Sequence, residues 1–208
     1  MHCLASVERF RVRAWPLVWL AVCSLLLVIT EPSTSAPEEI DAGFDIRNAR
    51  TTLVDGVFLL DADISFVFSE EALEAIENGI PVTIILEMQV LSERSLIWDN
   101  LWWDKAVAQI EAKFRIETRP LSKTYLLRNL NSGETQVFAS FAELVVGLGM
   151  IRNFPLLDEH LIDDESRYYL RLRTRLDIES LPSPMRPWAY LSSLWRLQSD
   201  WFEWPLER

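Results

Sequence analysis

Apolar and polar side chains alternate along much of this chain. From Ala106 to Glu117 (AVAQIEAKFRIE) the even positions are apolar and most odd positions are polar or charged. From Arg167 to Ile178 (RYYLRLRTRLDI) leucines alternate with arginines in the same way. A period of two places successive side chains on opposite faces of a strand, whereas a helix would scatter these apolar residues around its surface. Both segments are therefore predicted to be strands with one buried face and one solvated face.

Weaker alternation, bounded by turn residues, predicts further strands. The sequences NSG (Asn131–Gly133) and VDG (Val54–Gly56) are typical of tight turns between strands. Seven or eight strands with such turns favour an antiparallel β-sandwich. One polar face on each strand argues against a parallel sheet, whose strands are apolar on both faces. The additional strands are expected at Phe44–Leu53, Gly56–Phe68, Ile80–Leu91, Tyr125–Leu130 and Glu134–Ala139.

Two short helices are expected between the strands. Ser69 can cap a helix over EEALEAIEN that ends before Gly79. Ser140 and Glu143 form a capping box before LVVGLG, and Gly149 is the stop. The predicted fold is therefore mainly β: a single antiparallel β-sandwich-like domain with two short helices, preceded by an N-terminal signal or membrane segment.

The N-terminal residues have the order of a secretory signal peptide. Arg9, Arg11 and Arg13 precede an uncharged apolar run over residues 14–29, and small residues end at Ala36. The alternative is an uncleaved membrane anchor. As a helix the run would be about 24 Å long, which is short for a hydrocarbon core of about 30 Å. Both alternatives stay open, and both predict that the rest of the chain lies outside the cytoplasm.

These features predict how the chain is organised. Residues 1–36 are expected to be the signal peptide or anchor, 37–43 a tether, and 44–208 the β-sandwich-like domain. The predicted location is periplasmic, either secreted or tethered to the inner membrane by residues 14–30. Membrane contact would then run through the N-terminal segment if it is not cleaved.

Charge and the few cysteines and histidines exclude several classes of function. The formal net charge of −11 disfavours nucleic acid as a partner. Cys3 and Cys23 both lie in the leader, and His160 is the only histidine after His2. A thiolate metal site, a His-rich zinc site and a Cys–His dyad therefore lack their residues once the leader is removed. We expect no cofactor and no enzyme activity, although a carboxylate-based hydrolase would leave no sequence signature.

A row of arginines is the densest positive charge after the leader. Arg171, Arg173 and Arg175 alternate along one predicted strand, so their side chains share a face at spacings of about 6.6 Å. Such a row could dock an anionic group or an acidic partner surface. The alternative, favoured in so acidic a chain, is pairing with an acidic neighbouring strand.

Three tryptophans in RSLIWDNLWWDK (94–105) form a second candidate binding surface. Trp98, Trp102 and Trp103 lie with acidic residues beside them, between two predicted strands. Exposed tryptophan clusters mark interfaces or ligand sites. The alternative is that they cover one end of the sandwich, because tryptophan can do so while its N–H stays hydrated.

The acidic residues of DADIS imitate the first half of a calcium loop. Asp61 and Asp63 have the right spacing, but Phe66 and Ala72 stand where such a loop needs Gly and Glu. On a strand these acids would share a solvated face. A looser cation site with the acidic loop 158–165 stays open.

The last 21 residues hold four of the nine tryptophans. The prolines of LPSPMRP predict an extended approach to this tail. A helix would then group Trp188, Leu191 and Trp195, whereas a strand would align Trp195, Leu197, Ser199 and Trp201. The strand pattern is cleaner, so the tail is predicted to close the sandwich as a packed strap. A helix in this segment is the alternative.

Three stretches together resemble a known bacterial family. They run from Asp55 to Val90 (DGVFLLDADISFVF…), from Leu121 to Phe141, and from Ser166 to Leu206 (SRYYLRLRTRLDIESLPSPMRPWAYL…). This sequence is similar to the family called domain of unknown function 4390. The resemblance implies an N-terminal signal or single membrane segment and a gene neighbourhood with a membrane sensor histidine kinase. The family has no assigned activity, so it implies no catalytic residue.

The function expected from these observations is a non-catalytic periplasmic binding or accessory module. Its possible link to a membrane-bound sensor kinase, as partner, rests on the resemblance alone. The alternative is a carrier of an apolar or amphipathic ligand between the two sheets. An undetected carboxylate-based hydrolase ranks third.

Overall fold

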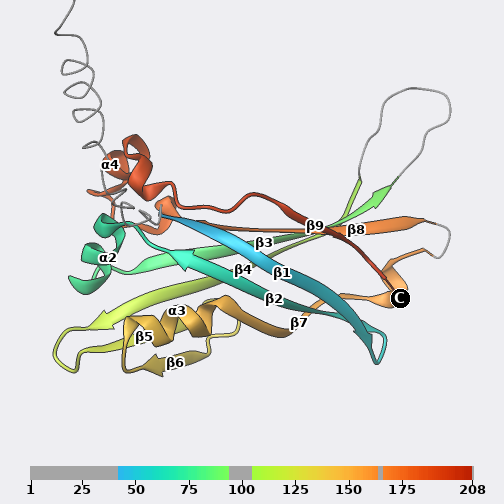
Figure 1. The fold of residues 1–208 in the computed structure, drawn as a ribbon, viewed down its shortest axis with the longest axis horizontal. Coiled ribbons are helices and arrows are strands. Elements are labelled where there is room, and N and C mark those ends of the chain that lie inside the picture. Colours follow the sequence, from blue (N-terminus) through green and yellow to red (C-terminus); the bar gives the residue numbers. More distant parts are fainter. Residues whose placement is uncertain (1–41, 94–104, 164–165, 208) are drawn as a thin grey trace, which may run out of the picture. The chain divides into compact units, whose positions relative to one another are not determined.

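The structure of the chain is a computed structural model that describes residues 42–93, 105–163 and 166–207. These residues belong to one compact unit, Ile40–Arg208. Figure 1 shows the elements in chain order. The strands are β1 (Gly43–Val54), β2 (Val57–Val67), β3 (Val82–Glu93), β4 (Lys105–Arg119), β5 (Thr124–Asn129), β6 (Thr135–Phe138), β7 (Met150–Asp158), β8 (Arg167–Leu176) and β9 (Phe202–Pro205). The helices are α2 (Glu70–Glu77), α3 (Phe141–Gly149) and α4 (Arg186–Leu191), with 3₁₀ turns η1 (Glu159–Leu161), η2 (Ile178–Ser180) and η3 (Ser193–Trp195).

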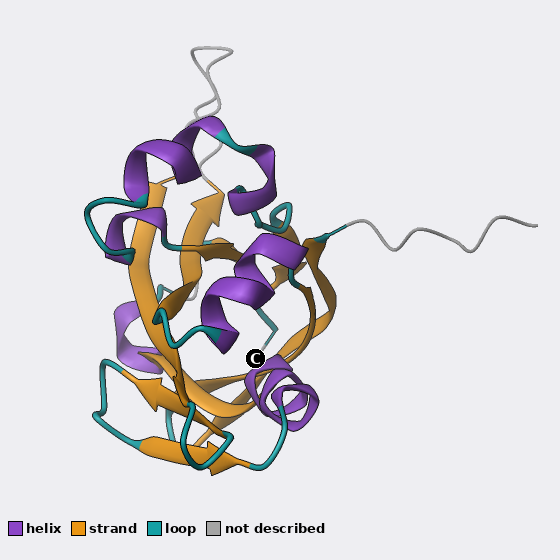
Figure 2. Cartoon of the chain, turned by 90° about the vertical axis from the view of Figure 1, so that its left-hand side faces the viewer, coloured by secondary structure: helices purple, strands orange, loops and turns teal. Residues whose placement is uncertain are grey.

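The strands form two antiparallel sheets. One has the order β1–β2–β7, and the other β6–β5–β4–β3–β8–β9. Strand β1 contacts β8 and β9 of the larger sheet, so the two sheets pack against each other. In the end-on view of Figure 2 the strands surround a common interior, and helices gather at the near end. The predicted antiparallel β-sandwich-like fold with two short helices is confirmed, and α4, six residues long, is a third, shorter helix.

The buried faces follow the period-two pattern. In β2 every second residue is buried from Phe58 to Phe66. In β8 the buried positions are Leu170, Leu172, Thr174 and Leu176, as the sequence pattern predicts for the leucines. Apolar side chains from both sheets join in one core, so the alternation reflects burial between the sheets.

Local signals place the turns and caps. Asp55 and Gly56 have φ of 50° and 79°, which is the left-handed geometry of a two-residue hairpin between β1 and β2. The Ser69 side chain accepts a hydrogen bond from the backbone N–H of Ala72 at 3.3 Å and so caps α2. Ser140 caps α3 in the same way. Both predicted helices therefore begin where their capping residues indicate.

Helix α3 lies between the two sheets at one side and contacts β2 as well as β5. Its last residue, Gly149, approaches the backbone of β2 so closely that a Cβ there would lie 2.3 Å from the carbonyl oxygen of Ile64. Glycine is required at this point for a steric reason, and its role as a helix stop is secondary.

Two segments differ from the sequence predictions. Strand β7 was not expected, because MIRNFPLLD does not alternate, and its pairing with β2 has register irregularities. The segment after Pro182 contains α4 and η3, and the closing strand expected over Trp195–Trp201 is wrong: Gln198 makes an isolated bridge there, and the strand, β9, begins at Phe202. Pro187 lies in the first turn of α4, where its missing N–H has no helical partner to lose.

Other predictions fall outside the described residues. The leader 1–36, the greater part of the tether and the tryptophans of 94–104 all lie there. Within the described part of the chain, no helix reaches the length and apolar character that crossing a membrane requires.

Candidate functional site

The arginine row lies on the outer face of β8. Arg171, Arg173 and Arg175 alternate with the buried residues of the strand, and all three are partly buried. Their neighbour is β3, where the register places Gln89 opposite Arg171 and Glu87 opposite Arg173. The predicted shared face is therefore present, and the row lies beside one acidic residue of the adjacent strand.

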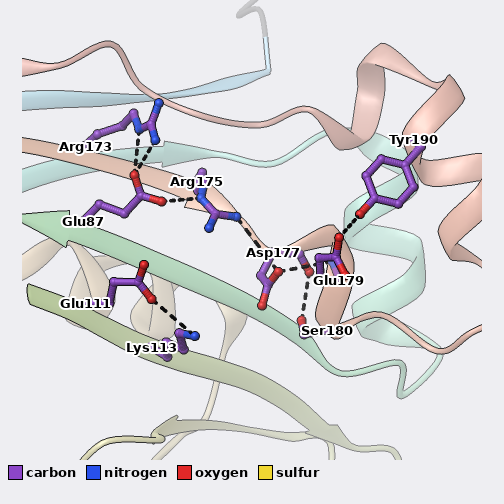
Figure 3. Close-up of polar contacts among 9 residues, drawn as sticks. All are labelled: Glu87, Glu111, Lys113, Arg173, Arg175, Asp177, Glu179, Ser180 and Tyr190. Atoms are coloured by element: carbon purple, nitrogen blue, oxygen red, sulfur yellow. Dashed lines mark hydrogen bonds and ion pairs between the residues drawn. The ribbon is translucent and has the colours of Figure 1, made fainter.

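Glu87 holds two of the three arginines. Its carboxylate accepts hydrogen bonds from Arg173 Nε at 3.0 Å and from Arg175 Nε at 2.6 Å (Figure 3). Glu87 is 7% exposed. Burial raises the pKa of this carboxyl, but the hydrogen bonds and charges of the two arginines outweigh burial, and the pKa lies below its usual value. Glu87 is therefore ionised at neutral pH and neutralises part of the row.

Trp201 covers the other side of the row. The guanidinium carbons of Arg171 and Arg173 each lie 4.5 Å from the centroid of its ring, which is a cation–π distance. Arg171 also donates through Nε to Gln89 Oε1 at 2.8 Å. The arginine side chains are thus fixed between β3 and the C-terminal tail.

Trp201 lies over the arginine row because the tail has one more residue than β8 between the two points where they pair. Gln198 bridges to Arg175, and Phe202 pairs with Leu172, so the tail advances four residues where β8 advances three. Such an insertion shifts the following side chains to the opposite face. The prediction that Trp201 shares the inner face of Leu197 is therefore wrong, whereas Trp195, Leu197 and Ser199 are buried as expected.

The expected pairing with an acidic neighbour strand is thus observed at Glu87. Much of the donor capacity of the three guanidinium groups is directed to Glu87, Gln89 and the ring of Trp201. This arrangement stabilises the junction of β3, β8 and the tail. Docking of an anionic partner on the row stays a prediction.

A pocket of about 340 Å³ opens beyond Arg175. Its polar groups include Arg196, which is exposed, and Glu179, which accepts a hydrogen bond from the hydroxyl of Tyr190 (Figure 3). This hydrogen bond raises the pKa of Tyr190, so the phenol stays protonated. The volume lies at the lower end of the range for ligand pockets, about 300–1,000 Å³. The pocket could admit a small polar group.

The acids of DADIS lie on the outer face of the smaller sheet. Asp61 accepts hydrogen bonds from the Asn153 backbone N–H at 2.9 Å and from Arg50 Nη2 at 3.0 Å. These contacts, the backbone bond first, lower the pKa of Asp61. Asp63 pairs with Arg152. The described residues contain no group of three or more His, Cys, Asp or Glu that could hold a metal ion.

The last sequence candidates are His160 and the tryptophans of segment 94–105. His160 lies exposed in η1, and its backbone N–H donates to the capping carboxylate of Asp158. Trp98, Trp102 and Trp103 lie outside the described residues, so the interface predicted for them stays a prediction.

The structure adds an apolar surface that was not predicted from the sequence. Trp188 and Leu191 of α4 are 75% and 77% exposed, and Leu194 of η3 is 43% exposed. We call these three residues the apolar patch. The tail is therefore only partly a packed strap: Trp195 and Leu197 are buried, whereas the apolar patch before them faces outward. The spacing of Trp188 and Leu191, together with Pro187, was the available signal for a helix with an apolar face.

The family comparison covers most of the chain. Residues 41–205 match the family model described as Domain of unknown function (DUF4390). No curated protein and no solved structure matches the chain. The match spans both sheets and the arginine row, and it ends in β9. This chain therefore belongs to the DUF4390 family.

Proposed function

We propose that this protein is a non-catalytic binding or accessory module of the bacterial envelope. The observation that supports this proposal is the apolar patch, in which Trp188, Leu191 and Leu194 expose large apolar side chains close together in the chain. Single exposed apolar residues are common on soluble proteins, whereas a contiguous group favours an interaction surface. Tryptophan is also the residue most enriched where binding energy concentrates.

The polar groups support the same proposal. Glu87, Asp61 and Asp63 each have arginine partners, so these carboxylates act in holding strands together. The interior between the sheets is filled by fully buried side chains such as Phe58 and Leu172. A carried ligand would have to displace them, which favours binding on the surface. A membrane sensor kinase as the partner is a further part of the proposal, which rests on the family resemblance.

The proposal is tested by crosslinking and pull-down from the native envelope. The full-length protein is compared with a Trp188→Ser/Leu191→Ser variant and with a Leu161→Ser control. Leu161 is 64% exposed and lies in η1, which is joined to the turn between β1 and β2 by the hydrogen bond from the Glu159 N–H to the Gly56 carbonyl oxygen. We expect the wild type and the control to capture the same membrane protein, and the double variant to lose it. Recovery of no membrane protein, or equal recovery by all three, would refute the proposal.

The double variant is expected to fold normally. Both side chains are mostly exposed, so their replacement should change the free energy of unfolding by less than about 0.5 kcal/mol each. Thermal unfolding followed by circular dichroism checks this point. Loss of capture without loss of stability then identifies the patch as the binding surface.

A further inference from the structure

A row of acidic side chains lies on α2. Glu70, Glu71, Glu74 and Glu77 are all exposed. The opposite side of the helix buries Ala72, Ala75 and Ile76, which fixes the direction in which the glutamates project. We call these four glutamates the acidic row. Among the described residues none of the four has an ion-pair partner, so their charges face outward.

The acidic row adjoins the apolar patch. Helix α2 contacts η3, the turn that carries Leu194. Ser69, which caps α2, donates through its hydroxyl to the carbonyl oxygen of Leu194 at 2.7 Å, across 125 residues of chain. Figure 1 shows α2 and α4 at the same end of the sheets. One surface therefore combines an apolar group with a neighbouring negative charge.

We propose that this surface binds a polypeptide segment in which large apolar side chains are flanked by lysine or arginine. The inference rests on the proposed function and specifies the chemistry of its partner. Interfaces commonly join an apolar centre to a polar rim, and opposite charges at the rim orient the partner and speed its association. The patch supplies the centre, and the acidic row supplies one side of the rim.

Other occupants fit this surface less well. An anionic lipid headgroup would be repelled by the acidic row, and a second copy of the chain, with its own net charge of −11, would bring like charges together. A basic and apolar polypeptide segment satisfies both halves of the surface.

The first strand of the described unit, β1, begins close to α2, which forms one side of this surface. Phe44, near the start of β1, packs against Phe68 with ring centroids 5.4 Å apart, and Ser69 follows directly. Residues 30–42, between the apolar run of the leader and β1, can span at most about 45 Å when extended. If the leader stays in the membrane, these residues keep the surface within reach of the juxtamembrane part of a membrane protein.

The test uses two fluorescent helical peptides with the same leucine and tryptophan face. One carries lysine on its polar face and the other glutamate. Binding to the full-length protein in phosphatidylcholine nanodiscs is measured by anisotropy, with empty nanodiscs subtracted. We expect the lysine peptide to bind at least about tenfold more tightly, and Trp188→Ser to weaken its binding about tenfold.

Charge reversal provides the specific control. The Glu74→Lys/Glu77→Lys variant should bind the lysine peptide at least about fivefold more weakly than the wild type does. These positions lie in the second half of α2, where lysine is favourable to the helix dipole, so the helix should stay folded. Glu134→Lys/Glu207→Lys changes the net charge equally at exposed sites before β6 and after β9, and it should change binding less than about twofold.

Several results would overturn the inference. These are equal binding of the two peptides, no binding of either, or equal effects of the two charge-reversed variants. A photo-crosslinker at position 191 that labels phosphatidylcholine instead of the lysine peptide would overturn it in favour of a membrane contact. Each of these outcomes leaves the proposed function to be judged by the envelope capture, because that experiment does not depend on the sign of the partner's charge.

Discussion

Replacing Glu87 by glutamine should destabilise the fold by about 2–3 kcal/mol. Removing one member of a buried ion pair typically costs about 3–5 kcal/mol, because the remaining charge stays desolvated. Here the Arg173 and Arg175 side chains are 30% and 32% exposed, so water can solvate part of the charge that loses its partner. The glutamine also retains one acceptor oxygen, which places the expected cost below the usual range.

The measurement is thermal unfolding of the full-length protein, followed by circular dichroism. For a domain of this size each kcal/mol shifts the midpoint by about 2–4 °C, so Glu87→Gln should lower it by about 4–12 °C. Glu111→Gln is the matched control. Glu111 lies directly opposite Glu87 on β4, but it pairs with Lys113 at 3.4 Å with both side chains about 40% exposed. Its loss should cost less than about 0.5 kcal/mol.

The effect of Glu87 should depend on pH. Because the folded pKa of Glu87 lies below its ordinary value of 4.5, its charge stabilises the folded state fully above pH 4.5. This stabilisation is lost as the pH falls through the lower folded pKa. The difference in midpoint between the wild type and Glu87→Gln should therefore be constant at neutral pH and shrink in acid. Equal midpoints for Glu87→Gln and Glu111→Gln at pH 7 would refute the argument that Glu87 holds the arginine row in place.

Four further substitutions and one truncation test the packing, the caps and the tail by the same unfolding measurement. Gly149→Ala should cost about 3 kcal/mol or prevent folding, because its Cβ would collide with the β2 backbone, while Gly43→Ala has open space and should be nearly neutral. Ser69→Ala should cost about 2 kcal/mol, because it loses both a cap and the bond to the tail, whereas Ser140→Ala loses a cap alone and should cost about 1 kcal/mol. A chain ending at Ser193 should aggregate or fail to fold, since it lacks the buried part of the tail, and an unchanged midpoint would show that the tail does not stabilise the sandwich.

Sequence patterns predict the elements well where the signal is local. The strand over 106–117 and the strand over 167–178 correspond to β4 and β8, and the NSG turn joins β5 to β6 as expected. Alternation succeeds because each strand has one face in the core. Strand β7 was not predicted by alternation, because the irregularities in its pairing with β2 break the period of two.

The candidate site was only partly predictable. The arginine row and its shared face follow from the spacing of three residues on one strand, and the favoured pairing with an acidic neighbour is observed. The identity of the partner, Glu87, required knowledge that β8 pairs with β3, which no local pattern supplies. Trp201 was placed on the wrong face, because a single inserted residue in an irregular segment is invisible to a periodicity argument.

The sequence by itself determined the strands that alternate regularly, the two capped helices and the polar faces, because these depend on side chains a few residues apart. Only the tertiary structure decided which distant residues meet. Glu87 and Arg173 lie 86 residues apart in the chain, and Ser69 and Leu194 lie 125 apart. The exposure of Trp188 was decided in the same way, because an apolar side chain is buried only if another element packs over it. In α4 no element of the described chain covers that side chain, and this makes the helix the proposed binding surface.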